Sequence, residues 1–449
     1  MKRPIHDRPF TNKDLLRLLV PLVIEQMLAV TVGLADSLMV SSLGEAAVSS
    51  VSLVDTVNVL LNSLFASLAT GGAIVTGQYL GAKNRENSQR SAEQLLIFNG
   101  AVALGITAIM YCLQKSIIYG LFGHIEADVA ANSLAYFRIV EISIPFLAVY
   151  SAGAALFRVM GNSKISMWIS LWMNLINVAG NALLVFVFKW GVAGVALPTL
   201  ASRIFAACAI LWLLRDQSLQ VHLSRDFRLR VDRKMVGLIV KTGVPNGIEG
   251  SMFQLGKILL MSVISSFGTV AIAANAIGST LFTFQNLPGN AASLASTTVI
   301  SQCTGLRDYD SSKYYAKKLL KFAHIGLLLS NGLVLLLLPG ILHIYNVSPE
   351  AKELARSLSI TYSVVCCLIW PVSFSFPQTL RASGDNRFVM VVSVVSMWLC
   401  RLVLGVVLSK YVGMGLHGVW IAMYADWVVR GACFVLRYRS GKWMTKAIK

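Results

Sequence analysis

Long runs of apolar residues, separated by short polar stretches, occupy most of this 449-residue chain. A membrane-spanning α-helix needs roughly 20 such residues, and a backbone in lipid must pair its polar groups internally. Each run is therefore predicted to be a transmembrane helix, and the fold an all-α polytopic membrane protein with twelve of them. The runs lie at about 15–41, 47–80, 92–113, 129–157, 165–188, 192–214, 235–266, 271–303, 319–338, 354–380, 388–409 and 416–436.

The composition excludes several classes of protein. Hydrophobic residues make up 56% of the chain and charged residues 13%, whereas a soluble domain has about 25% charged residues. A soluble fold would leave large apolar patches exposed, so a secreted enzyme, a disordered chain and a two-domain soluble catalyst are all excluded. The seven Cys and six His residues show no metal-ligand spacing, and we expect no metal site and no resident cofactor.

The basic residues alternate between the two sides of the predicted bundle. Most of the 39 Lys and Arg residues lie at the termini, in the break at 215–234 and in the loops on that side. Because cytoplasmic loops are enriched in Lys and Arg, we expect both termini in the cytoplasm of a multi-pass cell-membrane protein. This asymmetry accounts for the net charge of +18 without nucleic acid as a partner. The opposite loops hold only Lys115, Lys189, Lys352, Arg356 and Lys410.

The two halves of the sequence repeat at an offset of 224 residues. Matches of Pro, Glu, Gln and Gly in one register are much rarer by chance than matches of apolar residues. Six helices per half would start both halves on the same side, which predicts a parallel pseudo-two-fold repeat suited to alternating access. The predicted lobes are 1–214 and 235–449, joined by a cytoplasmic linker at 215–234. The matched pairs include Pro21 and Pro245, Glu25 and Glu249, Gly44 and Gly268, Gln78 and Gln302, and Gly194 and Gly418.

Short motifs occur in both halves in a fixed order. The first half contains Pro21, GLADSLMV at 33–40, LGE at 43–45 and GQYLGA at 77–82; the second contains PNGIE at 245–249, QCTG at 302–305 and LRASGD at 380–385. Over nearly its whole length the chain resembles the multidrug and toxic compound extrusion (MATE) transporters of the MOP flippase superfamily. The resemblance implies a monomeric antiporter in the lipid bilayer. It would export organic cations, drugs or other amphipathic compounds in exchange for H⁺ or Na⁺.

Acidic side chains inside the predicted helices are the main functional candidates, because ionisable groups at membrane depth are costly. Glu25 keeps an acidic counterpart in the second half, Glu249. The counterparts of Asp36 and Asp55 at the 224-residue offset are uncharged, so the chemistry at Asp36 is unique to the first half. The acids of the first half are Glu25, Asp36, Asp55 and Glu141.

The resemblance also implies an ion site. Members of the family that bind Na⁺ use an Asp of helix one, two residues of helix five one turn apart and a Thr of helix six; here the matching residues are Asp36, Asn177, Asn181 and Thr199. Na⁺ needs such oxygen ligands, whereas a proton needs only one carboxylate. Some members have an acid where Asn181 stands, so the choice of ion stays open.

Glu249, Glu25 and Asp55 are predicted to form a substrate site or a second coupling site. For Glu249 the alternative is a carboxylate bonded between helices. We expect Arg138 to pair with Glu141, three residues later.

Arg401 and Lys257 lie in or near predicted helices without an obvious role. They keep open a second function, a lipid-linked oligosaccharide or lipid flippase of the same superfamily. An ATP-driven pump would need a phosphate-binding loop, which the sequence lacks, and no nucleophile–base pattern suggests an enzyme or any catalytic residue.

Overall fold

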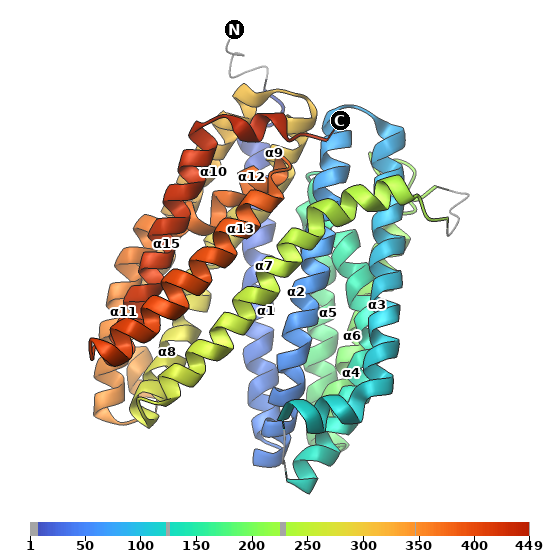
Figure 1. Cartoon of the computed structure of the whole chain (residues 1–449). Helices are drawn as coiled ribbons and strands as arrows, with labels where there is room; N and C mark the ends of the chain where they lie inside the picture. The colour runs from blue at the N-terminus through green and yellow to red at the C-terminus, as the bar shows by residue number, and fades with distance from the viewer. Residues whose placement is uncertain (1–7, 123–125, 225–229, 346, 449) are drawn as a thin grey trace. The chain divides into compact units, whose positions relative to one another are not determined.

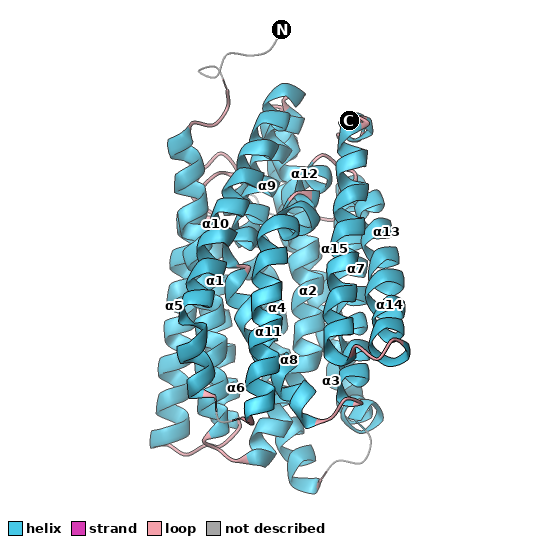
Figure 2. Cartoon of the chain, turned by 90° about the vertical axis from the view of Figure 1, so that its left-hand side faces the viewer, coloured by secondary structure: helices cyan, strands magenta, loops and turns pink. Residues whose placement is uncertain are grey.

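The structure, a computed structural model, describes residues 8–122, 126–224, 230–345 and 347–448. Over these residues the secondary structure is helical and contains no strand (Figure 2). Eleven of the described helical segments are long and apolar enough to cross a membrane. The predicted class, an all-α polytopic membrane protein, is therefore confirmed.

The chain forms two compact units, Val20–Gly247 and Met1–Leu19 with Ile248–Lys449. Two helices, α1 (Asn12–Ser41) and α7 (Arg233–Ser265), run through both units. Pro21 and Pro245 lie close to the points where these helices change unit, and each proline removes one backbone hydrogen bond there. The predicted division of the chain at 214 and 235 stays a prediction.

The first unit is built from long helices with small residues between them, coloured from blue to green in Figure 1. Helix α4 packs against α2, α3 and α6. The helices approach closely because glycines face large side chains: a Cβ on Gly153 of α4 would lie 2.6 Å from Ile210 of α6. Besides α1, the unit contains α2 (Glu45–Gly81), α3 (Arg85–Phe122), α4 (Ala127–Val159), α5 (Ser163–Ala182) and α6 (Ala193–Leu213).

The second unit contains shorter helical pieces and a large aromatic core. Rings of Phe282, Tyr362, Trp420 and Trp427 contact one another at centroid distances between 5.0 and 6.2 Å. Turns of π-helix interrupt the later helices at Pro371–Ser375, Met397–Val403 and Val407–Tyr411. After α7, the α-helices are α8 (Thr269–Gln285), α9 (Leu287–Gly305), α10 (Tyr309–Ile344), α11 (Pro349–Trp370), α12 (Pro377–Ala382), α13 (Asn386–Ser396), α14 (Leu404–Val406) and α15 (Gly415–Arg439).

The predicted segment at 271–303 is not one helix. It divides at Asn286 into α8 and α9, and this pair occupies the place of one predicted span. Pro288 at the start of α9 has no N–H to continue the helix. The Asn286 amide instead exchanges hydrogen bonds with the hydroxyl of Tyr362, at 2.7 and 3.0 Å.

The 224-residue repeat is visible in the backbone. Gly44 and Gly268 precede α2 and α8 with φ of 95° and 88°, a region that favours glycine. Lys83 and Arg307 follow the ends of α2 and α9 with φ of 58° and 55°. The π-helical turns Leu183–Val187 and Val407–Tyr411 stand at the same offset. The two halves therefore share turns and helix distortions as well as sequence.

Candidate functional site

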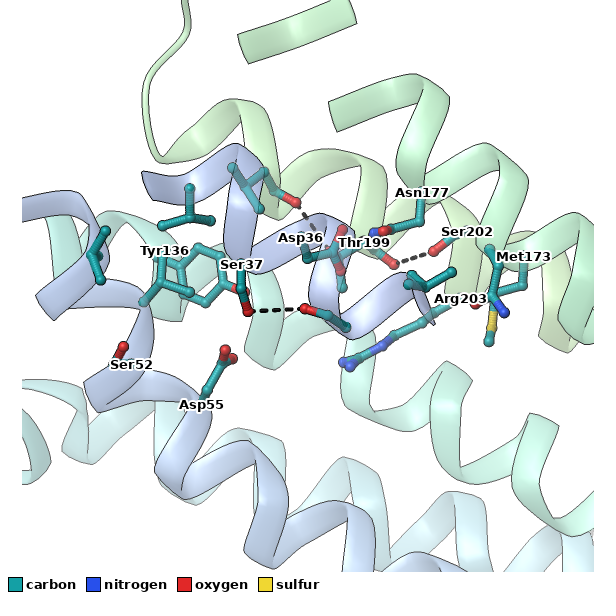
Figure 3. Close-up of a pocket in the computed structure, with 17 residues that line it drawn as sticks. Asp36, Ser37, Ser52, Asp55, Tyr136, Met173, Asn177, Thr199, Ser202 and Arg203 are labelled. Atoms are coloured by element: carbon teal, nitrogen blue, oxygen red, sulfur yellow. Dashed lines mark hydrogen bonds between the residues drawn. The ribbon is translucent and has the colours of Figure 1, made fainter. Parts of the chain in front are cut away.

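A cavity of about 300 Å³ lies inside the first unit, between α1, α2, α4, α5 and α6. Figure 3 shows its polar side chains converging from these five helices. These side chains lie on the helix faces that point away from the lipid, because polar groups at membrane depth need polar neighbours. Chief among them are Asp36, Asp55, Tyr136, Asn177, Thr199 and Arg203.

Asp36 is held by two asparagines of α5. Asn181 Nδ2 donates to Asp36 Oδ1 at 2.7 Å. The Asn177 amide is satisfied with its nitrogen toward Asp36 Oδ1 at 2.9 Å and its oxygen accepting from Thr199 Oγ1 at 3.0 Å. The four residues predicted as an ion site are thus brought together around one carboxylate, and their role as that site stays a prediction.

The site offers oxygen atoms to a cation. Besides the Asp36 carboxylate it holds the Thr199 hydroxyl and two amide oxygens, and Asn181 Oδ1, which is buried, has no hydrogen-bond partner. Hard monovalent and divalent cations bind such oxygen sets. Among the described residues no group of three or more His, Cys, Asp or Glu side chains is placed to hold a metal ion.

Asp55 lines the same cavity from α2. Asn58 Nδ2 lies 3.4 Å from its Oδ1, and the charge of Arg203 on α6 attracts it. Tyr136 presents its ring to the cavity beside Asp55 (Figure 3). Arg203 and Tyr136 were not among the predicted site residues. Arg203 follows Thr199 by one helical turn, a spacing that puts both on one face and could have revealed it.

The predicted pairing of Arg138 with Glu141 is wrong. Arg138 Nε donates to Gln114 Oε1 at 2.8 Å on the exposed side of α4. Glu141 points into the packed interior, is fully buried and has no hydrogen-bond partner for either oxygen. The charge that attracts it is that of Arg203, which donates to the Ser143 hydroxyl at 2.7 Å.

Glu25 lies outside this cavity, in an ion pair. Arg158 Nη1 is 3.0 Å from Glu25 Oε1, and Ser166 Oγ donates to Oε2 at 2.8 Å. In the second unit Glu249 is held in the same way, with Arg381 at 2.5 Å and Arg430 at 3.4 Å. This geometry agrees with the alternative given for Glu249, a carboxylate bonded between helices. A role in substrate binding stays a prediction for both glutamates.

A second cavity, of about 320 Å³, lies inside the second unit between α7, α8, α15 and the π-helical turn Met397–Val403. It occupies the repeat-related place. The positions of Asp36 and Asp55 are taken there by Leu260 and Ser279, and that of Asn177 by Arg401.

The MatE family model matches this chain twice, over residues 21–183 and 245–407. The two matches are offset by 224 residues, as is the internal repeat. Together they cover well over half of the chain, which therefore belongs to the MatE family of membrane transporters. It is a multi-pass membrane transporter of small molecules and not an enzyme.

Individual relatives extend over the whole chain. It is 24% identical to the uncharacterized transporter YisQ of Bacillus subtilis, covering 100% of this chain and 98% of the relative. It is 23% identical to the probable multidrug resistance protein NorM of Thermotoga maritima, covering 99% and 96%.

Solved structures share the fold. An outward-facing multidrug resistance MATE family transporter of the MOP superfamily matches with a TM-score of 0.90 and 20% identity, over 96% of both chains. A MOP superfamily transporter from Pyrococcus furiosus, described by the reverse polarity of its binding pocket, matches with a TM-score of 0.89 and 20% identity, over 97% of both chains.

Proposed function

We propose that this transporter is an ion-coupled secondary-active antiporter that exports organic cations, drugs or other amphipathic compounds by alternating access. The observation that carries this proposal is the Asp36 constellation, a carboxylate that lines a cavity and is bonded to two buried amides. The probable multidrug resistance proteins among its relatives support the substrate class.

The coupling ion, H⁺ or Na⁺, binds at Asp36. A proton neutralises the carboxylate and weakens the hydrogen bonds from Asn177 and Asn181. Na⁺ instead takes the carboxylate, the Thr199 hydroxyl and the amide oxygens, for which the two amides rotate. Either ion drives the cycle only by binding one conformation more tightly than the other. No resident cofactor is needed.

The substrate cation binds beside Asp55 in the same cavity. Asp36, Asp55 and the nearby Glu141 outnumber the single Arg203, so a cation is electrostatically favoured there. The ring of Tyr136 and the flexible Met173 supply an adaptable apolar surface. The cavity volume is at the small end of the range for ligand pockets, roughly 300–1,000 Å³. Glu25 and Glu249 are less available, because each is already paired with arginine.

The proposed setting is the cell membrane, with a monomer whose termini are both cytoplasmic. The excess of Lys and Arg in the loops on the side of the termini supports this orientation. Protease cleavage within the 215–234 segment tests it, because only a segment on the outer face of a sealed vesicle can be cut. We expect cleavage in inside-out vesicles and protection in right-side-out vesicles, and the reverse pattern would contradict the orientation.

The second candidate, a flippase for lipid-linked oligosaccharides or lipids, is favoured by Lys257 and Arg401 in the second cavity. Such a protein would move an anionic lipid, and ion binding at Asp36 would not drive this movement. Ion-driven export of a small dye therefore separates the two functions.

The test uses purified protein in proteoliposomes loaded with ethidium, with a proton or a sodium gradient imposed alone. We expect efflux with one gradient, and its loss in Asp36→Asn, because the amide cannot take up a proton and is a poor cation ligand. Asp128→Asn, at an exposed carboxylate in the first turn of α4, is the matched control and should retain transport. Full gradient-driven efflux by a folded Asp36→Asn protein would contradict the proposal.

A further inference from the structure

The cavity of the second unit has a charge that the proposed antiporter does not use. We propose that it is an anion-binding site, which takes the carboxylate, sulfonate or phosphate group of a compound with an apolar aromatic part. The proposal concerns a different cavity from that of Asp36 and does not depend on ion coupling.

Two cations line the cavity, Lys257 from α7 and Arg401 from the π-helical turn Met397–Val403. Both lie near the ring of Phe253, with Nζ of Lys257 at 5.2 Å and Cζ of Arg401 at 5.1 Å from its centroid. Arg401 is only 7% exposed, and its Nε has no hydrogen-bond partner. Among the described residues that line the cavity there is no carboxylate.

The acids behind the cavity have other arginines beside them. Glu249 is bonded to Arg381 and Arg430. Asp426 attracts Arg401, but its Oδ1 accepts from Ser396 Oγ at 2.6 Å and its Oδ2 lies 3.9 Å from Arg430 Nη1. Arg381 and Arg430 thus offset the two carboxylates, and the charges of Lys257 and Arg401 remain in excess. A buried charge such as that of Arg401 is normally compensated, so this excess favours binding of an anion.

The walls suit an aromatic ligand. Phe282, Trp420 and Met423 form an apolar side of the cavity. Trp420 Nε1 donates to Asn275 Oδ1 at 3.1 Å, while the Asn275 amide nitrogen contacts the Met261 sulfur at 3.9 Å. Sulfur is a weak acceptor, so this amide can donate to an anionic group instead. A guanidinium, an ammonium and an amide would then surround the anion.

The repeat shows that the charged residues of the two cavities stand at different positions. Lys257 stands where the first unit has Gly33, and Arg401 where it has Asn177. At the same time both acids of the first cavity are replaced, Asp36 by Leu260 and Asp55 by Ser279. The second cavity thus has cations at two positions where the first has uncharged residues, and it lacks both acids of the first. This is expected if the two cavities bind ligands of opposite charge.

The test measures equilibrium binding to the intact chain in lipid nanodiscs by calorimetry, without any gradient. The probe is naphthalene-2-sulfonate, compared with the neutral 2-naphthalenemethanol and with a naphthyl trimethylammonium cation. We expect the sulfonate to bind at least tenfold more tightly than either. Arg401→Gln and Lys257→Met should each weaken its binding about tenfold or more. Lys410→Gln, at an exposed cation of the π-helical turn Val407–Tyr411, is the matched control and should leave it unchanged.

Two outcomes would overturn the proposal. One is equal affinity for the three probes; the other is unchanged sulfonate binding in a folded Arg401→Gln protein. If that variant does not fold, Lys257→Met decides, because Lys257 is exposed on α7 and its loss leaves no buried group unpaired. Displacement of the sulfonate by chloride at an equal concentration would reassign the site to inorganic anions and reject the organic ligand.

Discussion

The two units place a cavity of similar size at the same position of the repeat, about 300 Å³ in one and 320 Å³ in the other. The first is lined by Asp36, Asp55 and Arg203. The second is lined by Lys257 and Arg401 and is backed by an aromatic core. Both units keep the backbone that makes a cavity, while the side chains that decide its charge differ.

The buried glutamate–arginine ion pairs, unlike the charges of the cavities, are the same in both units. Glu25 with Arg158, and Glu249 with Arg381, stand at matching places in both units. Each arginine is followed by a turn that ends at a glycine of positive φ, Gly161 or Gly384. A pair present in both units at a helix end indicates a structural role, whereas a position that changes charge between the units indicates a ligand.

The largest expected effect comes from Arg430, the more buried of the two arginines that contact Glu249. Arg430 contacts both Glu249 and Asp426, and its side chain is 3% exposed. Arg430→Met leaves two buried carboxylates short of a cation, which costs about 3–5 kcal/mol. Arg158→Met should cost less, about 1–3 kcal/mol, because Ser166 still bonds Glu25.

These stabilities are compared as apparent unfolding temperatures in detergent. Adding Asp426→Asn to Arg430→Met should recover part of the loss, since one uncompensated charge is removed. An exposed pair provides the control: Arg90→Met, opposite Glu86, should change stability by less than about 1 kcal/mol. Equal losses at Arg430 and Arg90 would show that burial does not set the difference between the pairs.

Most of the fold could be predicted from the sequence, because apolar runs of bilayer length allow little besides helices. The break at Asn286 was missed although Pro288 marks it in the sequence. What could not be predicted is the partner of the Asn286 amide, the hydroxyl of Tyr362, 76 residues away. The constellation of Asp36 with Asn177, Asn181 and Thr199 was predictable from the resemblance alone. Spacing along separate helices does not show which helices are neighbours.

The prediction that Arg138 pairs with Glu141 was wrong for the same reason: spacing in the sequence does not show what surrounds each side chain. Arg138 and Glu141 are close in sequence, but α4 turns one toward Gln114 and the other into the interior. The opposite charges of the two cavities were present in the repeat alignment as Gly33 with Lys257 and Asn177 with Arg401. Only the structure shows that Gly33 and Asn177 line one cavity and that Lys257 and Arg401 line the other.

The backbone repeat can be tested at one pair of glycines. A Cβ on Gly418 would lie 2.7 Å from the backbone of Leu408, whereas on Gly194 the nearest atom, in the backbone of Leu184, is at 3.1 Å. Backbone cannot move aside as a side chain can, so Gly418→Ala should cost about 1–3 kcal/mol. Gly194→Ala should be close to neutral, because a gain in helix propensity of up to about 1 kcal/mol offsets the smaller clash. Unfolding temperatures measure both, and a larger loss at Gly194 would contradict this difference in packing.

The smallest effect separates the two coupling ions at the first cavity. Thr199→Val keeps the shape of the side chain but removes the hydroxyl that donates to Asn177. If Na⁺ is the coupling ion, it loses one of its oxygen ligands, and we expect the sodium concentration for half-maximal efflux to rise several-fold, equivalent to about 1 kcal/mol. Thr199→Ser, which keeps the hydroxyl, should behave as the unchanged protein.

If H⁺ is the coupling ion, the carboxylate of Asp36 still takes the proton, and proton-driven efflux should survive both substitutions. Loss of proton-driven efflux in a folded Thr199→Val protein would contradict this expectation, because the proposed proton site needs only the carboxylate of Asp36.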